Sequence, residues 1–441
     1  MESTRTNSHN VFITTFGNIL PLLAALITAP VLARSLDVSG RGELAATTAP
    51  LILAAAGLTL GAPEAVTYFV ARGQARFWRS FLFALALVIP AGLVGMLIIF
   101  LCSDTLAKND SDIAYLIVLA SIAVLPSLAT LCIRGYARGR QAWTLIALDQ
   151  AIGSLFRVSG IGLLAIFGQL TVPTATAVTA IGVFVGVLAY LPLCYRRKDM
   201  PPERTEDRTH FGAFAKYGAA VWLGTAAGIL LTKLDLLLVL PLSNAYVLGI
   251  YVVAVNLADI VRVLIMSVRD VVFAAQASLA EDEPLARACR LSNGLAFVAG
   301  LLVSAMSVPL IPILFGSNFS DSVPVLIVLI IGVVVGSPGS VMAAGLTARG
   351  RPLLRSVATF CGLLVDLLFL VILVPVLGAL GAAIASALAY GVSGCVVLLL
   401  GRKSFGLRIR SHLIPTRSDL RYLRNALSRL PLIGRAFNGI R

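Results

Sequence analysis

Long apolar stretches separated by short polar segments run through almost the whole chain. Each stretch has about 20 residues, the length that an α-helix needs to cross the hydrocarbon core of a bilayer. The pattern predicts an all-α polytopic membrane protein with about twelve transmembrane helices. The expected spans are residues 11–33, 44–62, 80–101, 113–133, 143–165, 174–195, 217–240, 246–267, 291–314, 324–346, 356–376 and 380–400.

The composition agrees with this pattern. The chain has 441 residues, of which 58% are hydrophobic and 13% are charged. A soluble domain carries about 25% charged residues. The polar segments between the spans leave no room for a large soluble domain. The first apolar run is too long for the core of a signal peptide, so we expect no segment to be removed.

The positions of lysine and arginine predict the orientation in the membrane. If the N-terminus is cytoplasmic, basic residues collect at every predicted inside loop, and the outside loops hold only Arg34, Arg41 and Lys108. Basic residues are enriched in cytoplasmic loops of membrane proteins. The formal net charge of +14 then indicates contact with anionic lipid heads and not with nucleic acid. We expect a protein of the cytoplasmic membrane with both termini in the cytoplasm.

Two short sequence matches indicate an internal repeat. Ala-Arg-Gly-Arg at 137–140 returns at 348–351, and the segment 35–42 resembles 242–249, at offsets of 211 and 207 residues. Both pairs occupy equivalent places in the span pattern, which predicts two repeats of six helices. The predicted domains are a cytoplasmic N-terminus (1–10), an N-lobe (11–195), a cytoplasmic linker (196–216), a C-lobe (217–400) and a basic cytoplasmic tail (401–441). The tail forms either an amphipathic helix on the membrane surface or a solvated segment.

One apolar run, 230–240, contains both a cation and a carboxylate. A charge near the bilayer centre costs about 2.5–3.5 kcal/mol on insertion scales, so such residues usually face a bundle interior or a watery cavity. Lys233 and Asp235 are two residues apart and therefore point to different faces of a helix. Lys233 is a candidate for contact with a substrate phosphate, and Asp235 is a candidate for coupling or for holding a cation. The alternative is pairing with charges on other helices.

Four further charged residues inside predicted spans are candidates for a function. Arg157 is too deep in the fifth span to reach the interface easily, so it is either a substrate-binding cation or part of a structural ion pair. Asp259 and Arg262 are three residues apart and share a helix face, which predicts a salt bridge, with gating and substrate binding as the alternative roles. Asp366 is the best lone carboxylate for proton or cation coupling, unless a neighbouring cation pairs with it.

Two further candidates lie in the first span and just after the second. Glu64 follows a predicted helix break at 61–63, where it is suited to a salt bridge at the lobe edge, with substrate contact or gating as the alternatives. Asn18 accompanies Pro21 and Pro30 in the first span, which indicates a bent helix with a polar face and makes Asn18 a candidate substrate contact.

The sequence offers no pattern for catalysis or metal binding. The six cysteines are isolated, the three histidines lie in polar flanks, and no phosphate-binding loop motif is present. We therefore expect no catalytic residue, no metal site, no cofactor and no enzyme activity. The short predicted external loops also argue against a membrane-bound polysaccharide polymerase.

Three segments resemble a known family. The segment 373–386 resembles the Pro-Gly turn that joins the last two helices in the polysaccharide-transporter branch of the multidrug/oligosaccharidyl-lipid/polysaccharide exporter superfamily. The segment 249–254 is similar to the "GIYSVA" pattern of these proteins, and 234–235 to their "LD". Relatives often have asparagine in the helix before the turn, where this chain has Asp366. That departure weakens the transfer of a role to this position.

The resemblance implies a V-shaped transporter of two lobes that opens alternately to each side of the membrane. It also implies a lipid-linked saccharide as substrate, with polysaccharide assembly proteins as candidate partners. Moving such a substrate requires a hydrated groove with cations for its phosphate, and arginine suits this task because it is permanently charged and binds two oxygens at once. The alternative is an ion-coupled multidrug exporter of the same fold, which would favour an acidic or aromatic cavity.

Overall fold

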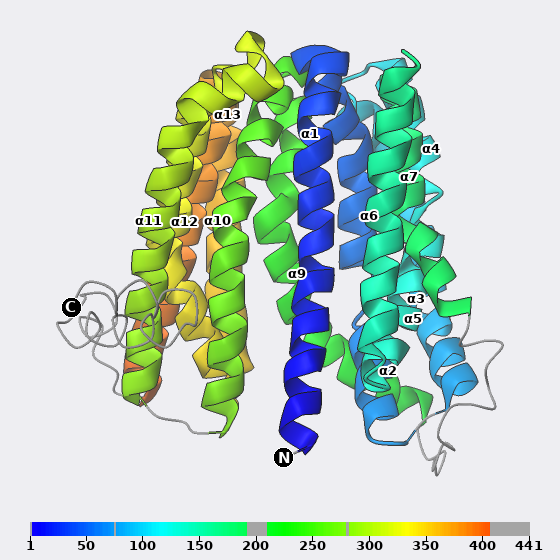
Figure 1. Cartoon of the computed structure of the whole chain (residues 1–441), viewed down its shortest axis with the longest axis vertical. Coiled ribbons are helices and arrows are strands. Elements are labelled where there is room, and N and C mark those ends of the chain that lie inside the picture. Colours follow the sequence, from blue (N-terminus) through cyan, green and yellow to red (C-terminus); the bar gives the residue numbers. More distant parts are fainter. Residues whose placement is uncertain (1, 75, 192–209, 279–281, 406–441) are drawn as a thin grey trace, which may run out of the picture.

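The computed structural model describes residues 2–74, 76–191, 210–278 and 282–405 (Figure 1). Every regular element in these ranges is a helix, as a membrane-spanning chain requires when its backbone groups find no water. The elements of the N-terminal part are α1 (Glu2–Gly57), α2 (Ala62–Ala71), α3 (Phe77–Leu106), α4 (Ser111–Ser121), α5 (Val124–Gly139), α6 (Trp143–Ile166), α7 (Val172–Val185) and η1 (Gly186–Tyr190). Those of the C-terminal part are α9 (Phe211–Leu242), α10 (Ala245–Ser278), α11 (Asp282–Phe315), η2 (Ser317–Phe319), α12 (Ser322–Ala348) and α13 (Pro352–Phe405).

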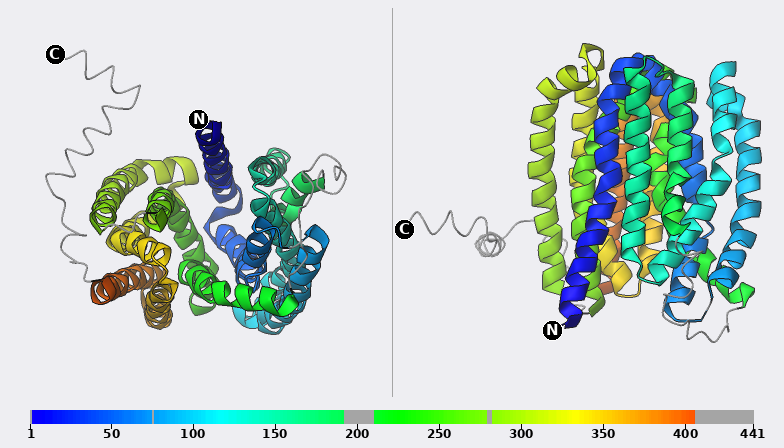
Figure 2. Two further views of the ribbon diagram at one scale, coloured as in Figure 1. Left: turned by 90° about the horizontal axis from the view of Figure 1, so that it is seen from below. Right: turned by 45° about the vertical axis from the view of Figure 1, so that its right-hand side comes forward.

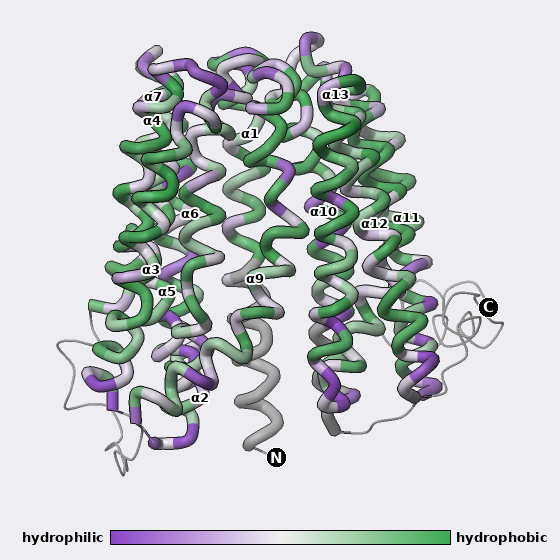
Figure 3. The backbone as a smooth tube through the Cα atoms, turned by 180° about the vertical axis from the view of Figure 1, so that it is seen from behind, coloured by the Kyte–Doolittle hydropathy of each residue, from purple (hydrophilic) through white to green (hydrophobic). Residues whose placement is uncertain are grey.

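The helices carry the apolar surface of a multi-pass membrane protein. Within the described ranges, nine helices are long and apolar enough to cross a membrane. Figure 3 shows hydrophobic residues along the length of the bundle and hydrophilic residues gathered at its two ends. Leu101, Ile166 and Val376 are 69%, 79% and 79% exposed. Exposure of such side chains is costly in water but not against lipid tails.

Two of the long helices, α1 and α13, each contain a break at which the chain folds back. The backbone of Asp37 leaves the helical region with φ 58° and ψ −177°, and that of Gly378 with φ 56° and ψ −128°. A Cβ atom on Gly381 would lie 2.3 Å from the carbonyl oxygen of Leu373, eight residues earlier. Eight residues of a straight helix span about 12 Å, so α13 is a helical hairpin. The turn expected between the predicted spans 356–376 and 380–400 is confirmed, and Figure 1 shows α1 turning back in the same way.

The helices form two groups, seen from below in Figure 2. Helices α1 to α7 with η1 pack mainly against one another and are called the N-lobe here, and α9 to α13 likewise form the C-lobe. The first half of α1 lies between the two groups, and α1 packs against α10 and α9 as well as against α6. One buried apolar core contains side chains of both lobes.

At the upper end of the bundle, away from the N-terminus in Figure 1, the lobes meet through two glycines. A Cβ atom on Gly42 would lie 1.8 Å from the carbonyl oxygen of Ala245, and one on Gly249 would lie 2.0 Å from the carbonyl oxygen of Val38. Glycine is therefore required at both positions for this close backbone approach. The contact is reciprocal, because each glycine packs against the residue four positions before the other.

Two cations add hydrogen bonds across the same end. Arg34 of α1 donates from Nε to the carbonyl oxygen of Leu314 at 3.0 Å and from Nη2 to that of Ile313. Lys108, between α3 and α4, donates to the carbonyl oxygen of Ser243. These three bonds join the N-lobe to the C-lobe, so the upper end is closed by backbone packing and by polar contacts.

Lower in the bundle, α9 joins the two lobes. A Cβ atom on Gly61 would lie 2.0 Å from the carbonyl oxygen of Gly218, and the indole N–H of Trp222 donates to the carbonyl oxygen of Gly57 at 2.5 Å. These contacts hold the first half of α9 against α2 and the end of α1.

Some predicted features differ from the structure or lie outside the described residues. Helix α1 begins at Glu2, whereas the first span was predicted to begin at residue 11. Residues 196–209 of the predicted linker and residues 406–441 of the basic tail lie outside the description. The side chain of Asn18 lies outside it as well.

Candidate functional site

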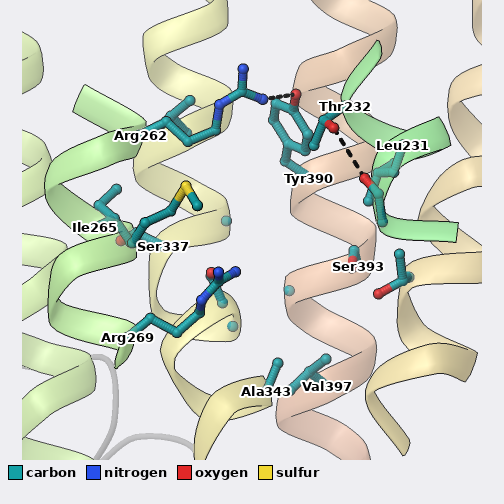
Figure 4. Close-up of a pocket in the computed structure, with 18 of the residues that line it drawn as sticks. Leu231, Thr232, Arg262, Ile265, Arg269, Ser337, Ala343, Tyr390, Ser393 and Val397 are labelled. Atoms are coloured by element: carbon teal, nitrogen blue, oxygen red, sulfur yellow. Dashed lines mark hydrogen bonds between the residues drawn. The ribbon is translucent and has the colours of Figure 1, made fainter. Parts of the chain in front are cut away.

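A cavity of about 470 Å³ lies in the C-lobe, between α9, α10, α12 and α13 (Figure 4). Leu22 of α1 contributes to its wall from the N-lobe. Arg262 and Arg269 project toward the cavity from α10 in Figure 4, and they are seven residues apart, or about two helical turns. We call this cavity the C-lobe pocket. Its charged lining side chains are Lys233, Asp259, Arg262, Arg269 and Arg355.

Asp259 pairs with two cations at this pocket. The Asp259 Oδ2 atom lies 3.5 Å from the Nζ atom of Lys233, and the Oδ1 atom accepts a hydrogen bond from Arg262 Nη2. A second N–H group of Arg262 donates to the hydroxyl of Tyr390 at 3.0 Å. The predicted Asp259–Arg262 salt bridge is confirmed, and Lys233 joins it from a different helix. Two cations share one carboxylate here, so a positive charge remains.

Two more arginines add positive charge lower in the pocket. Arg269 of α10 and Arg355 of α13 lie close enough for their charges to repel each other. With these, the pocket is lined by four cations and one carboxylate. A surface of this kind at membrane depth is suited to an anionic ligand.

Asp235 faces away from this pocket into the helix interface. Its carboxylate accepts hydrogen bonds from the hydroxyl of Tyr251 and from the backbone N–H of Leu236 at 2.8 Å. The Ser386 hydroxyl lies 3.5 Å from the same carboxylate. Lys233 and Asp235 therefore point to different faces of α9, as their spacing predicts. Asp235 belongs to a buried polar network of α9, α10 and α13.

Asp366 lies in the first half of α13 and is buried, with 1% of its surface exposed. Neither of its carboxyl oxygens has a hydrogen-bond partner among the described residues. Its charge lies close enough to that of Asp235 for the two carboxylates to repel each other. Burying an ionised carboxylate without a partner costs several kcal/mol or more, unless a proton or cation neutralises it.

A second cavity, of about 240 Å³, lies in the N-lobe and is called the N-lobe pocket. It contains one ion pair, between Arg134 and Asp149. Asp149 of α6 accepts from Arg134 Nε at 2.7 Å and from the hydroxyl of Tyr190 at 2.8 Å. The polar lining side chains of the pocket are Arg134, Asp149, Gln150, Ser154, Arg157 and Thr179.

Arg157 lines the same pocket two helical turns above Asp149 but does not share its carboxylate. The Nε atom of Arg157 is buried without a hydrogen-bond partner among the described residues, and so is the hydroxyl oxygen of Ser154. Arg157 forms no ion pair with any residue that the structure describes. Of the two roles predicted for Arg157, the structural ion pair is therefore not formed with any described residue.

Arg41 adds a buried guanidinium near the partly buried Arg157. The sequence pattern assigned Arg41 to an outside loop, but it lies inside α1 and is 6% exposed. Its Nε atom has no partner among the described residues, and its charge lies close enough to that of Arg157 to repel it. The correction has a simple cause: the chain turns at Asp37, so the second half of α1 begins earlier than the predicted span at residue 44.

Helix α1 separates the two pockets. Pro21 and Ala24 line the N-lobe pocket, and the adjacent Leu22 lines the C-lobe pocket.

Glu64, in the first turn of α2, lies in neither pocket. Its Oε2 atom has no hydrogen-bond partner among the described residues, and the side chain forms no ion pair with any of them. Its charge lies near that of Arg138.

The sequence pattern missed several residues of these networks. Asp149 is a carboxylate inside an apolar stretch, like Asp235. The search for charged residues inside predicted spans, which found Asp235, would also have found Asp149. Tyr190, Tyr251, Ser386 and Tyr390 gave no such signal, because tyrosine and serine are common in membrane helices whether or not they join a network.

The profile of the family described as "Polysaccharide biosynthesis protein" matches residues 8–274. No curated protein sequence matches the chain. Among solved structures, the chain is similar to an inward-facing multidrug resistance MATE family transporter of the MOP superfamily, at 18% identity and a TM-score of 0.67, over 86% of this chain and 94% of that one. It is also similar to the lipid II flippase MurJ in an inward closed conformation, at 14% identity and a TM-score of 0.68, over 89% of each chain.

A third similar structure is a MOP superfamily transporter from Pyrococcus furiosus, described as having a binding pocket of reverse polarity. It is 17% identical, with a TM-score of 0.62, over 89% of this chain and 93% of that one. These three similar structures are described as transporters or as a flippase. The chain belongs to the polysaccharide biosynthesis protein family and is a multi-pass membrane protein with the fold of the MOP superfamily transporters.

Proposed function

We propose that this protein is a flippase or exporter that moves a lipid-linked oligosaccharide or polysaccharide precursor across the cytoplasmic membrane by alternating access. The observation that carries the proposal is the C-lobe pocket, where four cations and one carboxylate line a cavity at membrane depth. A phosphate-linked saccharide head needs such cations in order to leave water. The lipid tail can stay in the bilayer while the head passes, and no covalent step is required.

The proposed architecture is twelve spans in two six-helix repeats, with the lobes at 11–195 and 217–400. The breaks at Asp37 and Gly378 support it, because each divides a long helix into two spans. The reciprocal contact of Gly42 and Gly249 supports it further, since the two glycines are 207 residues apart, the offset of the sequence repeat. Two equivalent halves related by an approximate twofold axis make contacts of this reciprocal kind.

The proposed orientation places both termini and the lower end of the bundle in the cytoplasm, which the distribution of lysine and arginine supports. The upper end, closed by the two glycines, would then be external. In the alternating cycle this end opens while the lower end closes.

The proposed roles follow the positions of the side chains. Lys233 and Arg262 contact the substrate from the C-lobe, and Arg157 contacts it from the N-lobe. For Asn18 the substrate contact is proposed from the sequence alone, because its side chain lies outside the described residues. Asp259 gates the C-lobe pocket, because it competes with substrate for the two cations that it pairs. Glu64 acts at the lobe edge.

We assign ion coupling to Asp235 and Asp366. The buried, unpartnered carboxyl group of Asp366 supports this role, because a proton or a small cation would neutralise it and change the packing of α13 against α9.

The substrate claim is tested with purified protein in liposomes. A fluorescent polyprenyl-pyrophosphoryl disaccharide reports movement across the bilayer, and each variant is compared with the wild type. We expect Arg262→Gln and Lys233→Gln each to slow movement by about tenfold or more, because each removes a charge-assisted contact. Lys216→Gln is the matched control, since Lys216 is exposed at the start of α9. A wild type that moves the probe no faster than protein-free liposomes contradicts the proposal.

The same liposomes distinguish the proposed flippase from the alternative function. That alternative is an ion-coupled multidrug exporter of the same fold. Export of a cationic dye by the wild type, without movement of the lipid-linked probe, would favour that alternative. The cations of the C-lobe pocket argue against it, because they repel a cationic drug.

Coupling is tested by imposing a proton or sodium gradient on the liposomes. We expect the wild-type rate to follow one of these gradients and the Asp366→Asn rate to lose that dependence. Asp321→Asn, at the exposed start of α12, is the control. If Asp366→Asn keeps the full gradient dependence, Asp366 is not the coupling group.

A further inference from the structure

Two hydrogen-bond donors in the N-lobe pocket have no acceptor among the described residues. Arg157 and Ser154 both line it, one turn apart on α6, and the Nε atom of the first and the hydroxyl of the second are buried without partners. Arg157 is partly buried, and a guanidinium that loses part of its hydration without gaining a counter-charge carries a desolvation cost that no ion pair offsets. Such a group is retained at a site where a ligand supplies the missing charge.

The charged groups around Arg157 strengthen this argument. The one carboxylate that lines the pocket, Asp149, is already occupied by Arg134 and Tyr190 at 2.7 and 2.8 Å. Arg41, also buried, adds a repulsive positive charge from α1. No described side chain therefore neutralises Arg157, and the local excess of charge is positive.

The N-lobe pocket is close to the C-lobe pocket, on the other side of a single helix. Pro21 and Leu22 are adjacent in α1, and each lines a different pocket. The two pockets therefore meet α1 at the same level and are separated by about the diameter of a helix with its side chains, 10–12 Å. A short oligosaccharide can span that distance around α1.

We propose that the N-lobe pocket is a second anion subsite that binds a carboxylate on the sugar part of the substrate, while the C-lobe pocket holds the phosphate of the lipid link. The inference rests on the proposed function and narrows the substrate class to acidic saccharides. A carboxylate carries a single charge and accepts two parallel hydrogen bonds from one guanidinium, which matches Arg157 with Ser154 as a further donor. A pyrophosphate carries more charge and is better matched to the four cations of the larger pocket.

The test measures binding to the full-length protein in lipid nanodiscs. Two polyprenyl-pyrophosphoryl disaccharides serve as probes and differ only in the terminal sugar, glucuronic acid in one and glucose in the other. We expect the wild type to prefer the acidic probe by about tenfold, the size of one charge-assisted contact. In Arg157→Gln this preference should fall to about one, and in Lys216→Gln it should stay at the wild-type value.

Two further variants keep the test informative if Arg157→Gln fails to fold. Arg157→Lys keeps the charge but loses the planar pair of donors, so it should retain part of the preference. Ser154→Ala should reduce the preference without changing any charge. Arg262→Gln should weaken binding of both probes and leave their ratio unchanged.

The outcomes separate this inference from the function on which it rests. Equal binding of the two probes by the wild type overturns the acidic-substrate claim and leaves the flippase proposal standing. An unchanged preference in Arg157→Gln and in Ser154→Ala also overturns the claim, because the preference would then arise elsewhere. If the wild type binds neither probe, both proposals fall together.

Discussion

The two pockets lie on opposite sides of α1, and their positive charges are held in different ways. In the C-lobe pocket, Lys233 and Arg262 come from two helices and share the carboxylate of Asp259. In the N-lobe pocket, Arg134 has the carboxylate of Asp149, and Arg157 has no described partner. The difference teaches that a charge inside a membrane span has two separable functions. A buried pair such as Arg134 with Asp149 holds helices together, whereas cations that share a carboxylate or have none, such as Lys233, Arg262 and Arg157, keep charge for a ligand.

The largest expected effect concerns the buried ion pair of the N-lobe. Asp149→Ala leaves the guanidinium of Arg134 and the hydroxyl of Tyr190 buried without a partner, so we expect the free energy of unfolding to fall by about 3–5 kcal/mol. Denaturant unfolding in detergent measures the change. Asp104→Ala, at the exposed end of α3, is the control. A loss as small as that of the control would mean that the pair does not stabilise the lobe.

The next largest effect concerns the two glycines at which the lobes meet, and it tests whether the lobes are equivalent halves. Gly42→Ala and Gly249→Ala each place a methyl group against a backbone carbonyl of the opposite lobe. We expect each to destabilise the closed upper end by about 1–3 kcal/mol, as overpacking does, and by similar amounts. Labelling of single cysteines near the upper end should then increase in both variants.

Gly162→Ala is the control for these variants, because a Cβ atom there would meet nothing within 4 Å. A large effect from one glycine and none from the other would show that the contact is not reciprocal in energy, and would weaken the case for two equivalent repeats.

A smaller loss is expected from the partly exposed network of the C-lobe. The side chains of Lys233 and Asp259 are 31% and 22% exposed, so water screens their pair. Asp259→Asn should lower the free energy of unfolding by about 1–2 kcal/mol, less than Asp149→Ala. Thermal unfolding measures this loss of stability, with Asp321→Asn as the control. A loss equal to that of Asp149→Ala would contradict the distinction between a buried pair and a shared, hydrated one.

The smallest change in stability is expected at Arg157. Arg157 is partly buried and has no ion-pair partner among the described residues, so a neutral side chain there removes a desolvation cost. Arg157→Gln should therefore change the free energy of unfolding by less than about 0.5 kcal/mol or raise it slightly. The same unfolding measurement applies. A loss above about 1.5 kcal/mol would show that Arg157 has a structural partner, and the contrast between the two lobes would disappear.

Much of the fold could be predicted from the chain because membrane spans have a strong local signal. Twenty apolar residues in a row must form a helix in lipid, whatever surrounds them. The positions of the turns were harder. The turn at Gly378 coincides with a glycine and a preceding proline, whereas the turn at Asp37 interrupts a helix without either, which is why Arg41 was assigned to a loop.

The sequence by itself determined that Lys233, Asp235, Asp259, Arg262 and Asp366 lie inside apolar spans, and which of them share a helix face. The period of the helix alone separates Lys233 from Asp235 and brings Asp259 beside Arg262, since these relations depend only on neighbours along the chain. Only the tertiary structure decided the partners: that Lys233 reaches Asp259, that Asp235 meets Tyr251 and Ser386, and that Arg157 meets no described carboxylate. The reason is that these contacts join faces of helices distant in sequence, and the relative rotation of packed helices is set by the whole bundle.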